Sequence, residues 1–270
     1  MQFSGIRLVE FSDIPAVMRM KDAAGWNQTA RDLERLLELE PEGFFTLVED
    51  GVPAATAAAL TYGESLAWIG MVLTLPEFRG RGFARRLMEQ VMAFAESRVR
   101  TMGLDASDMG IGLYRQLGFE TTGIVERWER APGAAPAASD DLEPWAPAAD
   151  LDLAAFGTDR RRLLACLARF EAACIPGLGF AMGRPGSKAT YFGPSVAKSA
   201  AAAERLLRWF LSRHSKETVY HDILCRNREA ARLASLYGFR PARRLTRMFR
   251  GPVTPADESL VFAIAGLEYG

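Results

Sequence analysis

The chain has 270 residues, of which 49% are hydrophobic and 24% are charged. This composition excludes a disordered or fibrous protein and suits one large or two modest globular domains. It contains no run of about eighteen apolar residues, so we expect no membrane span, and the N-terminus lacks a signal-peptide pattern. Cys166, Cys174 and Cys225 have no metal-like spacing and indicate free thiols in the cytoplasm. Because there are only two histidines, we expect no metal site.

The formal charge of zero hides an uneven distribution. Residues 1–130 carry 14 Lys+Arg and 19 Asp+Glu, a balance of −5, whereas residues 151–270 carry 19 and 10, a balance of +9. The two halves could dock on each other, or the basic half could face an anionic partner; segregated surface charge is the simpler alternative. Nucleic-acid binding is disfavoured because no basic and aromatic platform is present.

Residues 1–130 predict a mixed α/β domain, because strand-like and helical patterns alternate along them. Ser12 or Asp13 caps a helix that ends at Ala23, and Asp50-Gly51 predicts a hairpin turn. We expect further helices at 30–39, 83–98 and 110–117. We expect strands at 6–11, 44–49, 53–60, 66–73 and 102–106, and another from residue 119.

Residues 131–150 predict a linker. They are rich in Pro, Ala and Asp and show neither helical nor strand periodicity. The sequence therefore predicts three parts: a domain at 1–130, the linker at 131–150 and a second domain at 151–270.

A turn rich in glycine and arginine separates a predicted strand from a predicted helix. Residues 71–87 read Met-Val-Leu-Thr-Leu-Pro-Glu-Phe-Arg-Gly-Arg-Gly-Phe-Ala-Arg-Arg-Leu. Glycines let backbone N–H groups approach a ligand, and a helix N-terminus adds unpaired donors and the positive end of its dipole. The pattern predicts an anion cradle, above all for a pyrophosphate, with a tight turn carrying solvated arginines as the alternative. It is neither a P-loop nor a dinucleotide fingerprint.

Two motifs resemble a known family. Val72-x-Thr74-x-Pro76 precedes Arg79-x-x-Gly82-x-Ala84, and Leu113-Tyr114-x-x-Leu117-Gly118-Phe119 comes after them. Over residues 5–130 this order resembles the GNAT superfamily of acyl-CoA-dependent N-acyltransferases. The resemblance implies acetyl-CoA as co-substrate, with its pantetheine arm along Val72, Leu73 and Thr74. It implies that backbone N–H groups hold the CoA pyrophosphate over the segment Arg79, Gly80, Arg81, Gly82, Phe83 and Ala84.

The resemblance also implies that the Tyr114 hydroxyl lies against the thioester sulfur. Attack of a neutral amine on the acetyl carbonyl gives a tetrahedral intermediate that expels a thiolate. A phenol, whose reference pKa is about 10, can protonate that thiolate. A backbone N–H near Val72 or Leu73 would polarise the carbonyl oxygen. The alternative for Tyr114 is a helix tyrosine packed near Phe119.

The general base is left open. Residues 68–72, the strand from which some relatives supply a base, contain no carboxylate. Asp105, Asp108 and Glu77 are candidates, each with a cap or a surface charge as the alternative, and a water relay would also serve. Ser107 departs from the asparagine that many relatives have before this helix.

Gly25-Trp26-Asn27 lies where GNAT proteins commonly build the acceptor pocket. Trp26 and Asn27 could hold an amine-bearing substrate, although Trp26 could instead pack the two N-terminal helices together. Trp68, on the strand beside the cofactor, is a third candidate for substrate contact and equally a core residue.

The C-terminal half repeats the pattern weakly, which indicates an internal duplication. Residues 203–211 match 84–92, a strand at 219–224 precedes a helix that begins at Asn227, and Gly238-Phe239 matches Gly118-Phe119. We call residues 1–130 the first copy and 151–270 the second copy. At the phosphate-loop positions of the second copy, residues 193–198 lack paired glycines, and Ala234 replaces the tyrosine while Tyr237 points elsewhere. The second copy is therefore predicted to be degenerate.

Together these features resemble a bacterial subgroup of GNAT proteins with an appended, degenerate GNAT-like domain. The predicted fold is α/β (mixed α+β), with two tandem GNAT-like folds that each have a mixed central sheet flanked by helices. The predicted enzyme moves an acetyl group from acetyl-CoA to a primary amine, with a small metabolite favoured as the acceptor and homodimerisation left open. One alternative is a non-catalytic acyl-CoA sensor. Another is a second copy that binds an anionic partner, which predicts salt-dependent binding.

Overall fold

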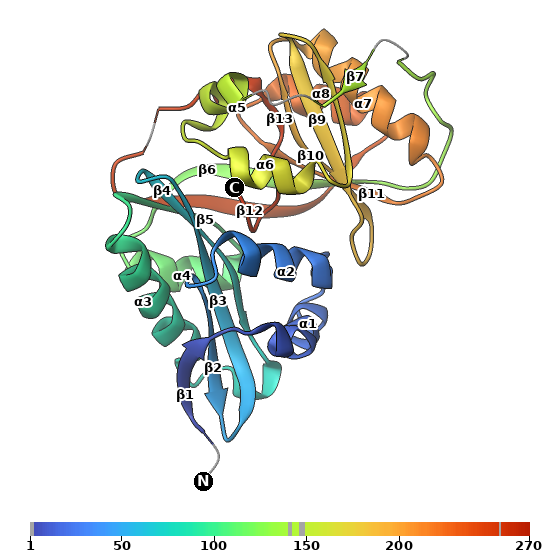
Figure 1. The fold of residues 1–270 in the computed structure, drawn as a ribbon. Helices are drawn as coiled ribbons and strands as arrows, with labels where there is room; N and C mark the ends of the chain where they lie inside the picture. The colour runs from blue at the N-terminus through green and yellow to red at the C-terminus, as the bar shows by residue number, and fades with distance from the viewer. Residues whose placement is uncertain (1–2, 140–141, 146–148, 254) are drawn as a thin grey trace. The chain divides into compact units, whose positions relative to one another are not determined.

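The structure is a computed structural model that describes residues 3–139, 142–145, 149–253 and 255–270. It forms two compact units, and most of their helices and strands are labelled in Figure 1. Unit 1 is built from the chain up to Leu104, Phe249–Val253 and Tyr269. Unit 2 is built from the described parts of 105–248 and 255–268, and from Gly270.

Unit 1 is a mixed sheet covered by helices. Its elements are β1 Gly5–Leu8, η1 Phe11–Asp13, α1 Ile14–Ala23, α2 Ala30–Leu39, β2 Phe44–Glu49, β3 Val52–Tyr62, β4 Leu66–Thr74, η2 Pro76–Phe78, α3 Phe83–Glu96 and β5 Thr101–Ala106. Strands β1 to β4 pair antiparallel in chain order, and β5 pairs parallel with β4. Helix α3 packs on one side of β2–β4, and α1 and α2 pack on the other (Figure 1). These elements match the predicted mixed fold.

Local sequence signals explain several of these boundaries. Asp50 and Gly51 have φ of 48° and 76°, and they connect β2 to β3 as a turn with two positive φ angles, as predicted. Asp32 accepts a hydrogen bond from the backbone N–H of Thr29 at 2.7 Å, which fixes the start of α2. The strand predicted at 6–11 ends earlier, at Leu8. Asp13 accepts from the Glu10 N–H at 2.9 Å and helps to turn the chain into η1 instead.

Unit 2 is a larger mixed sheet with helices. Its elements are α4 Asp108–Gln116, β6 Glu120–Arg130, β7 Glu143–Pro144, α5 Ala149–Phe156, α6 Arg161–Leu167, β8 Glu171–Ile175, β9 Gly179–Arg184, β10 Thr190–Ala197, α7 Ala200–Arg213, β11 Val219–Leu224, α8 Arg228–Leu236, β12 Arg240–Arg250, η3 Glu258–Leu260 and β13 Val261–Ala263. The strand order is β12-β6-β11-β10-β9-β8-β7, and β13 pairs with β10. Helix α7 packs on β8–β10, and α8 packs on β11 and β13.

The core of unit 2 contains residues from both sequence copies. Phe210 of α7, Ile223 of β11 and Phe239 are fully buried there. Trp128 of β6, which belongs to the first copy by sequence, is part of the same cluster. Residues 125–130 of β6 pair antiparallel with the whole of β11, from Arg130 opposite Val219 to Val125 opposite Leu224.

The compact units therefore do not match the predicted sequence boundaries at 130 and 151. The predicted division into 1–130 and 151–270 describes the duplication of motifs, whereas α4 and β6 of the first copy pack within unit 2. The predicted linker is partly ordered structure. Glu143 and Pro144 form β7 against β8, and the Gly133 N–H donates to the Ser215 carbonyl at 2.8 Å. Residues 140–141 and 146–148 of the linker lie outside the described residues.

The described part of the chain bears on two expectations from the sequence: one concerns membrane spans and the other concerns the cysteines. None of its helices has the length and apolar character that a membrane crossing requires. Cys166, Cys174 and Cys225 are all free thiols.

Candidate functional site

The predicted phosphate loop connects β4 to α3 in unit 1. Gly80 and Gly82 both have φ of 77°, a conformation that glycine adopts without strain. A Cβ added at either glycine would meet no heavy atom within 4 Å, so the space beside the loop is open. The glycines are therefore required by the backbone conformation of the loop and leave its backbone accessible.

The loop leads directly into the N-terminus of α3. Gly82 is the N-cap residue and has no side chain to satisfy the first-turn N–H groups, which have no acceptor within the helix itself. Four arginines cluster in sequence around this helix start, where the helix dipole also favours negative charge: Arg79, Arg81, Arg85 and Arg86. Arg81 lies over the Phe78 ring, 5.2 Å from its centroid, and Arg79 Nε donates to the Thr74 carbonyl at 3.3 Å. The arrangement suits an anion with several oxygen atoms.

A β-bulge shapes β4 just before this loop. Gly70 faces Ala58 and Leu73 faces Thr56, so β4 has one extra residue relative to β3. Met71 has φ of 51°, unusual for a residue other than glycine, and its carbonyl accepts from the Thr56 hydroxyl at 2.9 Å. The parallel pairing with β5 covers only Leu66–Trp68. Among the described residues, no strand pairs with 69–74 on that side, and binding of an extended ligand along Val72–Thr74 remains a prediction.

Tyr114 lies on α4 in unit 2 and is 9% exposed. Its ring meets the Phe119 ring edge to face, with centroids 6.2 Å apart. Burial raises the pKa of Tyr114 to about 12, so its hydroxyl is protonated at neutral pH. The predicted packing partner Phe119 is thus present, and the proton-donor role remains a prediction.

The candidate general bases have different surroundings. Both carboxylate oxygens of Asp105 accept from the Arg247 guanidinium, at 2.9 and 2.8 Å, and both side chains are buried. Asp108 is exposed in the first turn of α4, and Glu77 is exposed on η2. Ser107 is the N-cap of α4 but makes no side-chain capping bond. The ion pair therefore occupies the one buried carboxylate among the three candidates.

The three predicted acceptor residues all lie in unit 1. Trp26 is half-buried and Asn27 is buried, in the segment between α1 and α2. Trp68 is 1% exposed and meets Phe249 edge to face, with centroids 5.9 Å apart. A Cβ at Gly103 would come within 2.6 Å of the Trp68 ring, so this glycine makes room for it. Packing accounts for the position of Trp68, and contact of any of the three with substrate remains a prediction.

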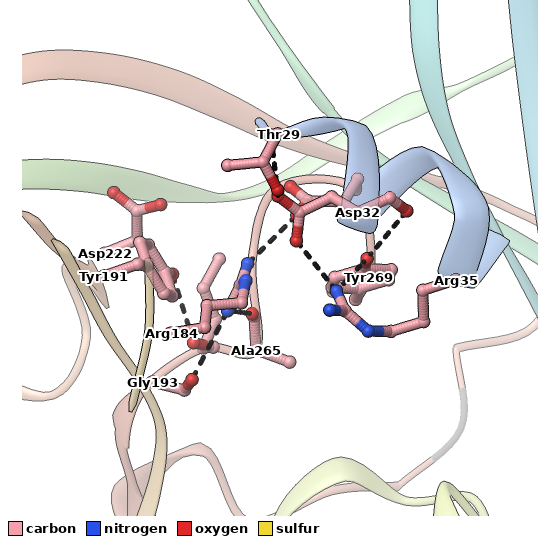
Figure 2. A network of polar contacts seen from close by, with 12 residues as sticks. Thr29, Asp32, Arg35, Arg184, Tyr191, Gly193, Asp222, Ala265 and Tyr269 are labelled. Carbon is pink, nitrogen blue, oxygen red and sulfur yellow. Dashed lines mark hydrogen bonds and ion pairs between the residues drawn. The ribbon is translucent and has the colours of Figure 1, made fainter. Parts of the chain in front are cut away.

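One buried polar cluster in unit 1 was not predicted. Arg35 of α2 pairs with Asp32 at 2.7 Å and donates to the Tyr269 hydroxyl at 2.8 Å (Figure 2). The Tyr62 hydroxyl donates to the Tyr269 carbonyl at 2.6 Å. Tyr269 is fully buried, yet it is more than 200 residues from its partners in sequence. No local pattern near Tyr269 indicates this placement, because the contact depends on the path of the whole chain.

The second copy keeps the framework of the first without its cradle. The Phe119 N–H donates to the Tyr114 carbonyl at 3.0 Å, and the Phe239 N–H donates to the Ala234 carbonyl at 3.0 Å. This confirms that Ala234 occupies the position of Tyr114. Tyr237 points elsewhere, and its hydroxyl donates to Glu204 at 2.6 Å.

The phosphate-loop positions of the second copy differ in structure from those of the first. Residues 193–197 lie within β10, and only 198–199 connect β10 to α7. The Ser199 side chain accepts from the Ala202 N–H at 3.2 Å and so caps α7. In the described part of the chain, no three His, Cys, Asp or Glu side chains group as a metal site would require.

Comparison with known proteins agrees with this duplicated framework. Residues 14–119 match the "Acetyltransferase (GNAT) family" model, and residues 148–263 match an "Acetyltransferase (GNAT) domain" model. An acetyltransferase of Yersinia pestis is 30% identical over 106 residues, which cover 37% of this chain and 73% of that protein. Holothin acyltransferase of Pseudoalteromonas is 30% identical over 99 residues, which cover 37% of this chain but only 33% of that enzyme.

A solved structure extends the similarity to the whole chain. A Pyrococcus horikoshii protein, proposed to be an acetyltransferase, superimposes with a TM-score of 0.89. It is 24% identical in sequence, and the match covers 100% of this chain and 98% of that one, which supports the tandem fold. The chain belongs to the GNAT acetyltransferase family and contains two GNAT domains in tandem.

Proposed function

We propose that this protein transfers an acetyl group from acetyl-CoA to a primary amine, with a small metabolite as the favoured acceptor. The observation that carries the proposal is in unit 1, where a bulged strand leads through two glycines of positive φ into a helix without a side-chain cap. Such a segment combines an edge for an extended arm with donors for a pyrophosphate.

In this proposal the first copy holds acetyl-CoA in two sections. The backbone N–H groups of 79–84 bind the pyrophosphate, and the edge of Val72–Thr74 hydrogen-bonds the pantetheine arm. A backbone N–H at Val72 or Leu73 polarises the acetyl carbonyl oxygen. The bulge supports this role, because the extra residue at Met71 turns the subsequent backbone away from the regular strand direction.

The reaction needs one nucleophile and one proton donor. The neutral amine attacks the acetyl carbonyl carbon, and the resulting tetrahedral intermediate collapses by breaking the carbon–sulfur bond. We assign Tyr114 as the group that protonates the departing thiolate, while the amine loses its proton to water or to an exposed carboxylate such as Asp108. Tyr114 is protonated over the physiological range, as a proton donor must be, and its raised pKa makes it a weaker acid than a solvent-exposed phenol.

We propose that the acceptor contacts Trp26, Asn27 and Trp68. In the sequence, the aromatic surface of Trp26 is next to the amide of Asn27. We place the protein in the cytoplasm, a proposal that the three free thiols support. The proposed partners are small molecules, with neither nucleic acid nor a membrane among them.

Calorimetric titration of acetyl-CoA tests the cofactor site. We expect binding that is lost in Gly82→Glu, where a side chain and a carboxylate are forced into the cradle. Gly63→Glu is the matched control, because Gly63 also has positive φ, at 58°, with no heavy atom within 4 Å of an added Cβ. Loss of binding in both variants, or in neither, contradicts the cradle. Thiol release on a panel of primary amines then tests the transfer itself.

The non-catalytic sensor stays as a second candidate because of the Asp105–Arg247 ion pair, which engages the one buried carboxylate among the candidate bases. A sensor binds acetyl-CoA with the same response to Gly82→Glu but releases no CoA with any amine. Transfer to any primary amine above the rate of hydrolysis excludes it.

A further inference from the structure

The central strands of the two copies have the same pairing. In unit 1, β4 pairs parallel with β5 for three residues, from Leu66 opposite Thr101 to Trp68 opposite Gly103. In unit 2, β10 pairs parallel with β11 for three residues, from Thr190 opposite Val219 to Phe192 opposite His221. Both β4 and β10 also have one extra residue relative to the antiparallel strand on their other side.

Beyond these three pairs the two copies differ. In unit 2 the segment Val261–Ile264 enters between β10 and β11. Ala263 pairs with Ser195 and Val261 with Val196, antiparallel to β10. On the other side, the Ile264 N–H donates to the Asp222 carbonyl of β11 at 3.0 Å. The segment is therefore hydrogen-bonded to both strands beyond the point where they separate.

Side chains of the second copy bind the carbonyl groups of this segment. Asn227 Nδ2 donates to the carbonyls of Ser259 and Val261 at 3.0 and 2.9 Å. His221 Nε2 lies 2.7 Å from the Phe262 carbonyl. Burial lowers the pKa of His221 to about 4, so the ring is neutral and donates through Nε2. The Tyr191 hydroxyl donates to the Ile264 carbonyl at 3.1 Å.

The groove also fits the segment closely. Residues 261–265 are all buried. A Cβ at Gly193 would come within 2.3 Å of the Ile264 carbonyl oxygen, so only glycine fits there. Arg184 donates to the Ala265 carbonyl at 2.8 Å and to the Gly193 carbonyl at 3.4 Å (Figure 2). Strand β10, Asn227 at the start of α8 and Gly193 therefore all contact one extended peptide segment.

We propose that Val261–Ile264 is an internal strand ligand that fills, in the second copy, the groove that corresponds to the pantetheine site of the first. This inference rests on the proposed function, which assigns that site to Val72–Thr74. An extended peptide and a pantetheine arm offer the same chemistry to a strand edge, namely amide groups along an extended chain. The protein consequently binds one acyl-CoA per chain, and Asn227 and His221 act as peptide-binding residues.

Hydrogen exchange of the full chain, with and without saturating acetyl-CoA, tests the inference together with calorimetric stoichiometry. We expect one acetyl-CoA per chain, slower exchange over 72–86, and slow exchange over 259–265 that acetyl-CoA does not alter. A second binding event, or altered exchange over 259–265 on addition of acetyl-CoA, overturns the inference and leaves the proposed function standing. The absence of any acetyl-CoA binding overturns the proposed function and the equivalence of the grooves with it.

Asn227→Asp tests whether the groove holds the segment in solution. The carboxylate keeps the acceptor that caps α8 through the Ala230 N–H, at 3.1 Å, but removes the donor to Ser259 and Val261. We expect exchange over 259–264 to rise at least about tenfold, with unchanged exchange in α8 and unchanged acetyl-CoA affinity at the first copy. Glu229→Gln, at an exposed position in the first turn of α8, is the control in unit 2. Unchanged exchange over 259–264 in Asn227→Asp contradicts the inference.

Discussion

Gly110 and Tyr114 lie one turn apart on α4, and a Cβ added at Gly110 would come within 2.6 Å of the Tyr114 ring carbon Cε2. The ring therefore lies over a position where only glycine leaves room for it. Gly112, two residues further along the same helix, has no heavy atom within 4 Å of an added Cβ. These two glycines form a matched pair for testing the position of Tyr114.

We expect Gly110→Ala to slow acetyl transfer about tenfold, because the displaced ring no longer aligns its hydroxyl with the leaving group. Gly112→Ala should keep the wild-type rate and stabilise the protein by up to about 1 kcal/mol through higher helix propensity. Steady-state rates and acetyl-CoA affinity measure the effect. Equal rates in the two alanine variants would show that the position of Tyr114 does not matter.

Tyr114→Phe should lower kcat about 100-fold while acetyl-CoA affinity stays within about a factor of two, because the phenol acts on the leaving group alone. The matched control is Tyr237→Phe. Tyr237 belongs to the second copy, and its pKa is also raised to about 12, by burial and by its bond to Glu204. Tyr237→Phe should leave kcat unchanged. A Tyr114→Phe enzyme with wild-type kcat would remove the proton-donor role.

The pH dependence of Tyr114 is determined by its raised pKa. In the folded protein the hydroxyl ionises near pH 12, above the reference value of 10.0. Its contribution to stability is therefore complete below pH 10 and is lost as the pH rises through 12. Below about pH 10 we expect no fall in kcat that Tyr114→Phe abolishes, and pH–rate profiles of the two proteins measure this. A wild-type decline at lower pH that is absent in the variant would show a lower pKa.

Asp105→Asn should lower the free energy of unfolding by about 3–5 kcal/mol, because it removes the charged partner from the buried Asp105–Arg247 ion pair. Asp108→Asn changes an exposed first-turn residue and should cost only about 0.3–1 kcal/mol. Urea unfolding measures both. If Asp105→Asn instead kept full stability and lost turnover, Asp105 would be a catalytic base and not a structural ion-pair partner.

The contributions of the two histidines to the free energy of unfolding should depend on pH in opposite directions. His214 lies 2.5 Å from Glu171 and 3.3 Å from Glu217, and Glu171 also pairs with Arg213. Its hydrogen bond to Glu171 raises the pKa of His214, so its contribution is complete below 6.5 and is lost as pH rises through the folded value. The lowered pKa of His221, about 4, makes stability fall as pH drops from 6.5 towards 4.

The variant His214→Gln separates the pH-dependent contribution of His214 from that of His221. The stability difference between wild type and this variant should be larger at about pH 5.5 than at about pH 8.5, because only the protonated ring gains from Glu171. Urea-unfolding midpoints at the two pH values provide the comparison. A difference that does not depend on pH would mean that the pKa of His214 is the same in the folded and unfolded states.

Much of the framework could be predicted from sequence, because the signals are local. The bounds of α2, β2 and β11 agree with the prediction to the residue. Asn227 begins α8 as predicted, because its side chain accepts from Ala230. The equivalence of Tyr114 and Ala234 was also predicted, since each lies five residues before the phenylalanine of a Gly-Phe pair.

The parts that could not be predicted depend on pairing between distant segments. β13 is a short segment near the end of the printed sequence, and its partners on β10 are more than 60 residues earlier. The pairing of β6 with β11 and the burial of Tyr269 are of the same kind. Residues 193–198 are predicted to stand at the degenerate phosphate-loop positions of the second copy, and the structure shows that 193–197 form the second half of β10 while 198–199 connect it to α7. Periodicity identifies a strand but not its partner.

The packing of strand β6 within unit 2 has a consequence for the evolution of this chain. Residues of the first sequence copy, Trp128 among them, complete the core and the sheet of unit 2. A deletion that removed the second copy would leave β6 without its partner strand β11 and Trp128 without the core residues that surround it. Loss of the second copy would therefore remove part of the structure into which the first copy folds, so selection for folding acts on both copies together.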